Sequence, residues 1–369
     1  MDLVGFDTLS LLFDLDHAVA TIASKALPRE RRERSGGISH LYGNFPLLSA
    51  TLHLPPSGMF SPAALVLTAS LPRLICGENS RPVGTRLAAE AVTDLCGRFA
   101  ALAGIQLDPS SGRVCRADFC ATFAPFLSSQ ELIARLAQVD LPRRDRAAMG
   151  NGASFYSNAA KETVYDKFGE IDRSIKRLTR RASDDPNVAR HLAALLRAER
   201  RLACGALRVE CRINGSRAIA NRLRLPIASP ELVLTTTNAA RVVDSFLAQL
   251  RPRLVSASAP AAARSLSRDL GSIRGQRAFA LLALADLSGS IEVAAAALGI
   301  PATGAERLAS AARTAGIGSI DVRGRSEELA LALPAVSVEG TDRFERRLLR
   351  TWRRTSAASS SSSSLSWAA

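Results

Sequence analysis

The sequence has few of the residue types that build metal centres and disulfide-bonded folds. It contains six cysteines and four histidines in 369 residues. No two cysteines form a C-x-x-C pair, and the histidines do not extend the cysteines into a zinc pattern. We therefore expect the buried, reduced thiols of a cytosolic protein, and neither a disulfide framework nor a zinc site.

The sequence also lacks the long apolar segments of membrane proteins. No apolar run reaches the roughly 18 residues that a membrane-spanning helix needs. No positively charged and then apolar N-terminal stretch precedes a cleavage site, so we expect no signal peptide. We expect a cytoplasmic protein that has no membrane partner.

Basic residues outnumber acidic ones, which indicates the kind of molecule that the protein binds. The chain has 48 Lys and Arg against 34 Asp and Glu, a formal net charge of +14. A surplus of this size favours a polyanion, because neutralising phosphates releases counterions and so drives binding. A basic protein of a GC-rich genome, in which Arg replaces Lys, is the alternative. The length and the 47% of hydrophobic residues suffice for two domains.

The first third of the sequence predicts a sheet with a helix packed on it. Alternating or β-rich stretches predict strands at Asp7–Asp16, Thr51–Leu54 and Ala63–Ser70. Apolar residues at helical spacing predict an amphipathic helix over Thr85–Leu102. The basic stretch Pro28–Gly37 predicts a loop, either a solvated surface or a contact for phosphate.

A polar face marks the strand predicted at Gly112–Phe123. Arg116, Asp118 and Cys120 share one side of it, because side chains alternate along a strand. A buried Asp is costly unless it is paired or binds a metal. A structural Arg–Asp pair and a metal ligand are both open interpretations.

A second strand of the same kind is predicted at Ala206–Asn214, where Arg208, Glu210 and Arg212 share one face. If the two strands are neighbours, Asp118 and Glu210 can converge on Mg²⁺ or Mn²⁺, which prefer carboxylate oxygens. The arginines would then clamp phosphate oxygens. A pure ion-pair network is the alternative.

Tyrosine is scarce, and one of the three tyrosines has a reactive setting. Tyr42, Tyr156 and Tyr165 are the only ones, and Tyr165 stands in a Y-x-K-x-x-E pattern with Lys167 and Glu170. A phenol beside a cation and an acid can attack a phosphodiester. If the stretch is a strand, Lys167 lies on the same face as Tyr165, and if it is a helix the two side chains diverge. Glu170 is either a metal ligand or a base. An ordinary core tyrosine is the bland interpretation.

Basic helices follow the tyrosine. The first is expected to offer its cations to a DNA backbone: Arg173, Lys176, Arg177, Arg180 and Arg181. Val188–Leu202 predicts a second helix, in which His191 is a packing or surface residue.

Alanine- and leucine-rich helices are expected from Pro230 onward, with a linker at Ser256–Ser267. Ile291–Gly316 predicts two short helices around a Gly-Ile-Pro turn, a helix-turn-helix in which Arg307 and Arg313 would bind DNA. The serine-rich stretch Thr355–Ala369 predicts a disordered tail.

Four motifs in this order resemble the replication-initiation proteins of filamentous phages, the gene II/X family, which includes plasmid replication proteins. They are G-E-N at Gly77–Asn79, R-x-D at Arg116–Asp118, Y-x-K-x-x-E at Tyr165–Glu170 and R-V-E-C-R-I at Arg208–Ile213. The resemblance covers roughly 71–226. The family often has G-H-N where this chain has Glu78, so a role for a histidine there is lost or taken over. The His-hydrophobic-His metal motif of many rolling-circle nucleases is also missing.

The resemblance implies an initiator that nicks one strand of a double-stranded origin, holds the 5′ phosphate on Tyr165 and rejoins the displaced single strand. Lys167 and Glu170 are the matched companions, and Asp118 and Glu210 the matched strand acids. The implied partners are origin DNA, a host helicase and a single-strand-binding protein in a bacterial host cytoplasm. A non-catalytic DNA-binding regulator and a decayed copy that binds without cutting are the alternatives.

The expected fold is α+β, a rolling-circle nuclease-like antiparallel sheet with helices on one face, followed by a mainly helical C-terminal domain. We assign 1–229 to nicking, 230–354 to the helical domain and 355–369 to the tail.

Overall fold

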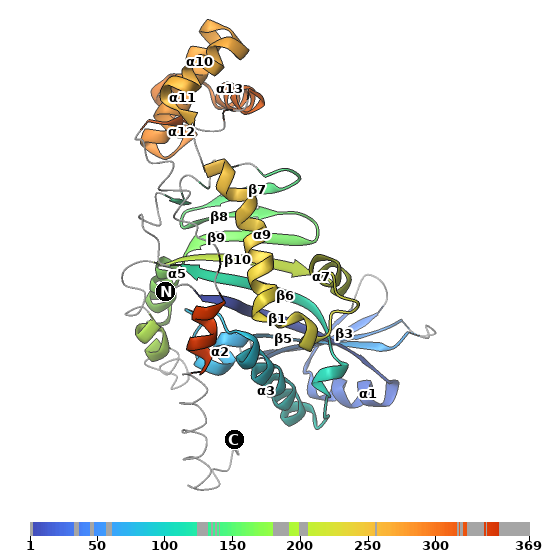
Figure 1. Cartoon of the computed structure of the whole chain (residues 1–369). Coiled ribbons are helices and arrows are strands. Elements are labelled where there is room, and N and C mark those ends of the chain that lie inside the picture. The colour runs from blue at the N-terminus through green and yellow to red at the C-terminus, as the bar shows by residue number, and fades with distance from the viewer. Residues whose placement is uncertain are drawn as a thin grey trace. The chain divides into compact units, whose positions relative to one another are not determined.

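A ten-stranded antiparallel sheet dominates the computed structural model (Figure 1). The structure describes residues 3–32, 37–44, 48–56, 61–123, 132–133, 136, 139, 141–179, 192–198, 206–254, 257–315, 317, 320–322, 336 and 338–346. The strands follow the order β2-β3-β4-β5-β1-β6-β10-β9-β8-β7, and a separate pair is β11-β12. The α+β class is therefore confirmed. A nuclease-like fold and a separate C-terminal helical domain are not confirmed and stay predictions.

The strands are β1 (Leu3–Leu15), β2 (Arg29–Arg32), β3 (Ile38–Asn44), β4 (Leu48–Leu54), β5 (Ala63–Ser70), β6 (Arg113–Phe123), β7 (Asp145–Met149), β8 (Gly152–Tyr156), β9 (Ala160–Asp166), β10 (Leu207–Asn214), β11 (Ala257–Ser258) and β12 (Ile320–Asp321). The helices are α1 (His17–Ala26), α2 (Leu71–Cys76), α3 (Thr85–Ala103), the 3₁₀ turn η1 (Pro109–Ser111), α5 (Lys167–Thr179), α7 (Ser216–Leu223), α8 (Pro230–Val233), α9 (Thr236–Leu254), α10 (Ala259–Leu270), α11 (Ser272–Ser288), α12 (Ile291–Ala297) and α13 (Ala302–Thr314). Residues 192–198 and 339–346 are also helical.

Two compact units divide the chain, and each is built from segments that are distant in the sequence. The first comprises Met1–Thr122, Arg212–Val242 and Val336–Ala369, and the second Phe123–Cys211 and Val243–Ala335. The boundary expected at 229/230 falls within a segment of the first unit. The three-part assignment stays a prediction, and Thr355–Ala369 lies outside the described residues.

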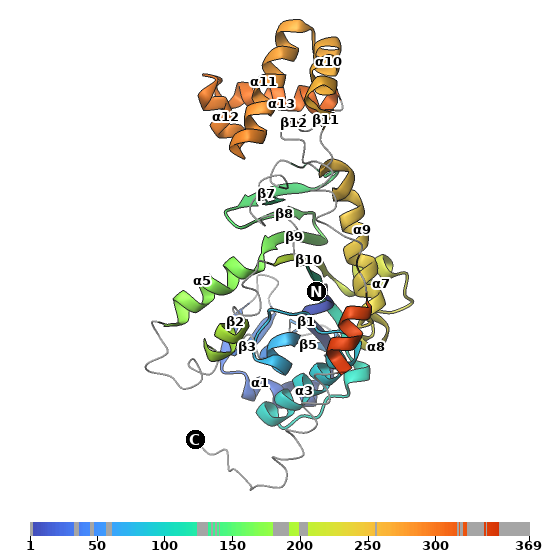
Figure 2. The same ribbon diagram turned by 60° about the vertical axis from the view of Figure 1, so that its left-hand side comes forward.

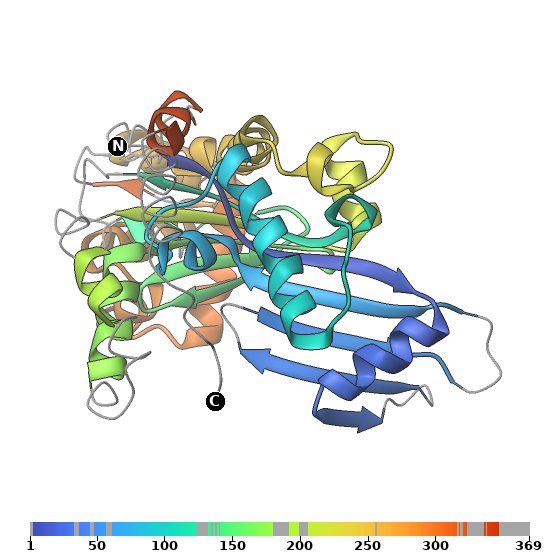
Figure 3. The same cartoon turned by 90° about the horizontal axis from the view of Figure 1, so that it is seen from below.

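Strands β1 to β5 and the helices α1 and α3 form the core of the first unit (Figure 3). Strand β1 pairs antiparallel with β5 over Thr8–Leu15 and with β6 on its other side. Helices α1 and α3 contact β4 and each other, and α3 buries its apolar stripe, including Leu87, Leu95 and Phe99. The sequence therefore predicted β5 and α3 closely and β1 and β4 in part, whereas α1, β2 and β3 were not predicted.

The helix 339–346 lies against the first strand and against the beginning of α3. The Thr341 hydroxyl accepts a hydrogen bond from Val4 N at 2.8 Å and donates one to Val4 O at 2.9 Å. The Glu345 carboxylate accepts hydrogen bonds from Leu87 N at 3.0 Å and Arg86 N at 3.3 Å. Because the first N–H groups of a helix have no intrahelical acceptor, Glu345 caps α3 from a distant part of the chain.

The second unit contains the antiparallel ladder β7-β8-β9 and a cluster of helices. Phe155 of β8 packs on Phe246 of α9, with ring centroids 5.9 Å apart. Helix α5 buries Ile171 and Ile175 against the helical residues 192–198. Helices α10 to α13 gather beside β11 and β12 (Figure 2). Their packing surfaces are mostly alanine and leucine.

Two predictions from loop-like composition are wrong. The basic stretch Pro28–Gly37 was expected to be a loop, but Arg29–Arg32 form strand β2, which pairs with β3 at the edge of the sheet. Ser256–Ser267 was expected to be a linker, but most of it belongs to α10, where Ala262 and Leu266 are fully buried. The serine, alanine and proline content suggested an irregular connection. Ala262 and Leu266 are instead spaced four residues apart, as on the buried face of a helix.

Most cysteines among the described residues are buried, as expected. The cysteines of the described residues are free, and Cys96, Cys120 and Cys211 are buried. Burial raises the pKa of Cys96 to about 11, and the Asp108 carboxylate contributes to the shift. Within the described ranges, no helix is both long and apolar enough to cross a membrane.

Candidate active site

Tyr165 stands at the end of β9, where a strand passes directly into a helix. Residues Ala160–Asp166 are extended, and α5 begins at Lys167. Lys167 N donates to Ala206 O at 2.9 Å, so the beginning of α5 is tied to the beginning of β10. This junction brings Tyr165 and the β10 side chains together.

Glu210 accepts a hydrogen bond from the Tyr165 hydroxyl. The Oη–Oε1 distance is 2.6 Å, a short bond between a phenol and a carboxylate. Tyr165 is partly exposed. The phenolic proton therefore already has an acceptor.

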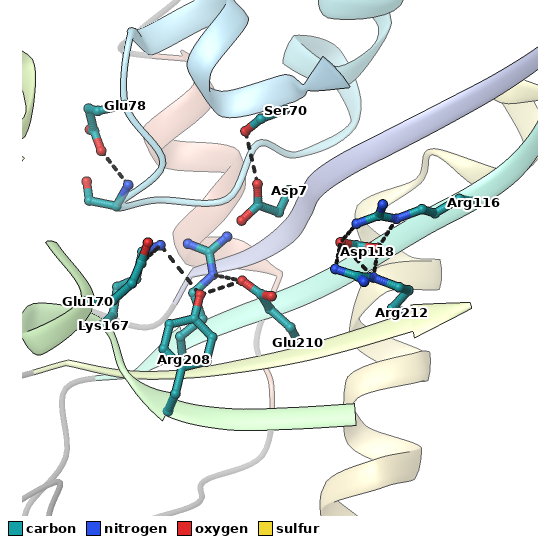
Figure 4. Close-up of polar contacts among 12 residues, drawn as sticks. Asp7, Ser70, Glu78, Arg116, Asp118, Lys167, Glu170, Arg208, Glu210 and Arg212 are labelled. Carbon is teal, nitrogen blue, oxygen red and sulfur yellow. Dashed lines mark hydrogen bonds and ion pairs between the residues drawn. The ribbon is translucent and has the colours of Figure 1, made fainter. Parts of the chain in front are cut away.

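Lys167 is fully buried and lies beside Glu170 (Figure 4). Its Nζ atom is 3.5 Å from Tyr165 Oη, 5.6 Å from the centre of the tyrosine ring and 2.5 Å from Glu170 Oε2. A buried ammonium needs such partners, because an unpaired one would carry the full cost of desolvation. The sequence left open a strand or a helix here. At the strand–helix junction the lysine still reaches the phenol.

Arg208 is also fully buried, and it pairs with the carboxylate that receives the phenol (Figure 4). Its Nε atom is 3.1 Å from Glu210 Oε1, and the Glu210 side chain is 19% exposed. Arg208 was predicted to bind DNA. Its burial favours a different role, which is to hold Glu210 in place.

Asp118 is the centre of an ion-pair cluster in the first unit (Figure 4). Arg116 contacts its two oxygens at 3.0 and 2.8 Å, and Arg212 Nε contacts Oδ1 at 3.1 Å. The side chain of Asp118 is 3% exposed. The sequence left open a structural Arg–Asp pair or a metal ligand for Asp118, and this arrangement is an Arg–Asp pair.

The three carboxylates expected to bind Mg²⁺ or Mn²⁺ each form an ion pair with an arginine or lysine side chain. Asp118 is held by two arginines, Glu210 by Arg208 and Glu170 by Lys167. No group of three or more His, Cys, Asp or Glu side chains that could hold a metal occurs among the residues described. A divalent cation would have to replace these partners, so this donor set as folded does not fit one. The metal requirement stays a prediction.

The remaining DNA-binding candidates lie on two helices. Arg173, Lys176 and Arg177 are exposed on α5, and Lys176 pairs with Asp172 at 2.8 Å. Arg180, Arg181 and His191 lie outside the described residues. Arg307 and Arg313 are on α13, as expected for the second helix of the predicted pair.

Other buried polar groups of the first unit were not predicted as site residues. In the first unit, Ser70 Oγ donates to Asp7 Oδ1 at 3.0 Å, and both residues are buried (Figure 4). Glu78 is buried too, and its carboxylate accepts a hydrogen bond from Ser80 N. A strand pattern alone did not distinguish Asp7 from a surface acid. The Glu78 carboxylate thus binds its own loop.

Comparison with models of protein families and with curated proteins gives no match to this chain.

Proposed function

We propose that the protein is a tyrosine-dependent DNA nickase and strand transferase that initiates rolling-circle replication at a double-stranded origin. The observation that carries this proposal is the 2.6 Å hydrogen bond from Tyr165 Oη to Glu210, beside a buried lysine. A phenol is a weak nucleophile at neutral pH, with an ordinary pKa of about 10. A carboxylate in contact with its proton and a cation close to its oxygen are what it needs to react.

In the nicking step, Tyr165 Oη attacks the phosphorus of a phosphodiester and Glu210 takes the phenolic proton. The Oη–P bond forms as the bond between phosphorus and the 3′ oxygen breaks. The leaving oxygen takes a proton from solvent, which gives a free 3′-hydroxyl and a 5′ phosphate on Tyr165. The Lys167 ammonium, 3.5 Å from Oη, stabilises the negative charge of the transition state.

The same groups run the reaction backwards when the displaced strand is rejoined. A 3′-hydroxyl loses its proton to solvent as it attacks the phosphotyrosine, and Glu210 returns its proton to the leaving Oη. The phosphotyrosine keeps the energy of the phosphodiester, so the exchange needs no ATP. No step is assigned to a metal, because Glu210 serves here as the base and is paired with Arg208.

A nicking assay with matched tyrosine variants tests the proposal. Supercoiled plasmid carrying the DNA that flanks the coding sequence is incubated with wild type, Tyr165→Phe or Tyr156→Phe, with and without Mg²⁺. Tyr156 lies on the neighbouring strand β8 and is 38% exposed, so its variant is a control for loss of a phenol. We expect nicked circles with covalently attached protein for wild type and Tyr156→Phe only. Equal adduct from Tyr165→Phe would refute the proposal.

A non-catalytic DNA-binding regulator is the second candidate, and the α12–α13 pair favours it. Ser290 caps α12 by accepting hydrogen bonds from Glu292 N and Val293 N, and Gly299 makes the turn with a φ of 64°. Two short helices around such a turn are typical of DNA-reading modules. Sequence-specific binding without any nick, on DNA that holds the origin, would support this candidate over the nickase.

A further inference from the structure

A cavity of about 480 Å³ lies among α11, α13 and the turn that precedes α13. Three arginines line it, Arg274 and Arg277 from α11 and Arg307 from α13. Its apolar lining includes Ile273, Ile300 and Leu308. Arg274 and Arg277 stand at i and i+3, so both project from the same face of α11.

The helices around the cavity pack closely on one another. Leu281 and Ala285 of α11 pack against Ala294 and Ala305, whose small side chains let the helices approach. A Cβ on Gly275 would lie 2.5 Å from Leu266 O, so α11 is also in close contact with α10. Arg274, Arg277 and Arg307 lie outside this core and are exposed.

The charge around the cavity is unbalanced. Among the described residues that line it, none is acidic. In the part of the chain that the structure describes, Arg274, Arg277 and Arg307 form no ion pair with a carboxylate. Three guanidinium groups facing one cavity repel each other unless an anion lies between them, and arginine binds phosphate through two parallel hydrogen bonds.

We propose that this cavity holds a backbone phosphate of duplex DNA when α13 approaches the major groove. In a helix-turn-helix, the first residues of the second helix meet the bases while neighbouring groups hold the flanking phosphates. Here the cavity lies at the beginning of α13, so Arg274 and Arg277 of α11, the helix before the α12–α13 pair, become phosphate-binding residues. The proposal rests on the DNA-binding part of the proposed function and not on the chemistry of Tyr165.

A charge-matched pair of double variants tests it in the full-length protein. Arg274→Gln/Arg277→Gln removes two cavity arginines, and Arg264→Gln/Arg268→Gln removes two exposed arginines of α10 that do not line the cavity. Fluorescence anisotropy measures binding to a labelled duplex of the flanking DNA from about 50 to 200 mM salt, the range in which phosphate contacts change affinity strongly. Thermal unfolding checks that both variants fold. A labelled single strand and inorganic phosphate as competitor complete the set.

The cavity variant is expected to bind the duplex at least about tenfold more weakly than the α10 variant, and its salt slope should be lower by about one for each phosphate that the arginines no longer neutralise. Equal affinities and slopes for the two variants would overturn the proposal. A weakening confined to the single strand, or displacement of the duplex by inorganic phosphate at low concentration, would also overturn it in favour of another ligand. The nicking assay with Tyr165→Phe measures the covalent step, whereas this titration compares the binding of two variants that both keep Tyr165, so failure of the nickase proposal and failure of this one are distinguishable.

Discussion

Gly152 lies directly opposite Tyr165 in the β8–β9 ladder. A Cβ built on Gly152 would be 2.6 Å from Tyr165 Cβ and 2.6 Å from Val164 O. A side chain at position 152 could not make contacts this short. Tyr165 can therefore occupy its observed position only because residue 152 is a glycine. The position of the proposed nucleophile thus depends on a residue that has no chemistry of its own.

Gly152→Ala should reduce adduct formation by about 10²-fold, since displacing a reacting group by about 1 Å is enough for such a reduction. Gly150→Ala is the matched control, because a Cβ there has no heavy atom within 4 Å. Adduct yields and thermal unfolding of both variants check the prediction. If both variants form the adduct as wild type does, Gly152 does not position Tyr165.

Glu210→Gln should lower the rate of adduct formation by about 10²–10⁴-fold, the usual contribution of a general base. The amide can still accept the hydrogen bond from Tyr165 Oη, but it cannot take the proton. Single-turnover rates measure the decrease, and Glu231→Gln, an exposed glutamate of α8, is the control. An unchanged rate for Glu210→Gln would remove Glu210 from the mechanism.

Thr341→Val should destabilise the protein by about 1–3 kcal/mol, because it leaves buried backbone groups of Val4 without their partner. Valine has nearly the shape of threonine but lacks the hydroxyl. Thr341→Ser keeps the hydroxyl and should be less destabilised. Urea unfolding of the two variants separates the hydrogen bonds from the packing. A larger destabilisation for serine than for valine would show that packing dominates.

Glu345 predicts a pH dependence of stability. Burial raises the pKa of Glu345 above its ordinary value, against the hydrogen bonds from backbone N–H groups of α3, which lower it. The folded state therefore binds more protons than the unfolded state at pH values between the ordinary and the raised pKa. The free energy of unfolding consequently falls as pH rises through this window.

The difference between wild type and Glu345→Gln isolates this effect, since glutamine does not titrate. The stability of wild type relative to the variant should be greatest below the ordinary pKa of about 4.5 and should decline toward neutral pH. Urea unfolding at a series of pH values measures it. A relative stability that grows with pH would contradict the burial of Glu345.

The sequence predicted those elements whose periodicity is long and whose ends are marked. Ala63–Ser70 is found with the expected bounds, and Thr85–Leu102 differs from α3 by one residue. The stretch around Tyr165 gave no clear period, because a seven-residue strand passes into a helix without a turn. Strand β9 was therefore not assigned.

The candidate residues were predicted from residue types, but their contacts were not. Alternation put Arg208 and Glu210 on one face of a strand, yet it could not show that Arg208 is fully buried. The strand–helix junction that brings Lys167 to 3.5 Å from the phenol depends on pairing between segments distant in sequence. Gly152, Arg274 and Arg277 had no signal, because their importance comes only from what the fold places beside them.

Peptide mapping of the DNA adduct tests the central claim most directly. After digestion of the DNA, trypsin separates the three tyrosines, since Tyr165 lies between Lys161 and Lys167, Tyr156 between Arg146 and Lys161, and Tyr42 before Arg73. Mass spectrometry should find a nucleotide attached through its 5′ phosphate on the peptide Glu162–Lys167 and on neither of the other two peptides. Such a nucleotide on the peptide of Tyr156 or Tyr42, or nicked DNA without any modified tyrosine, would contradict the account.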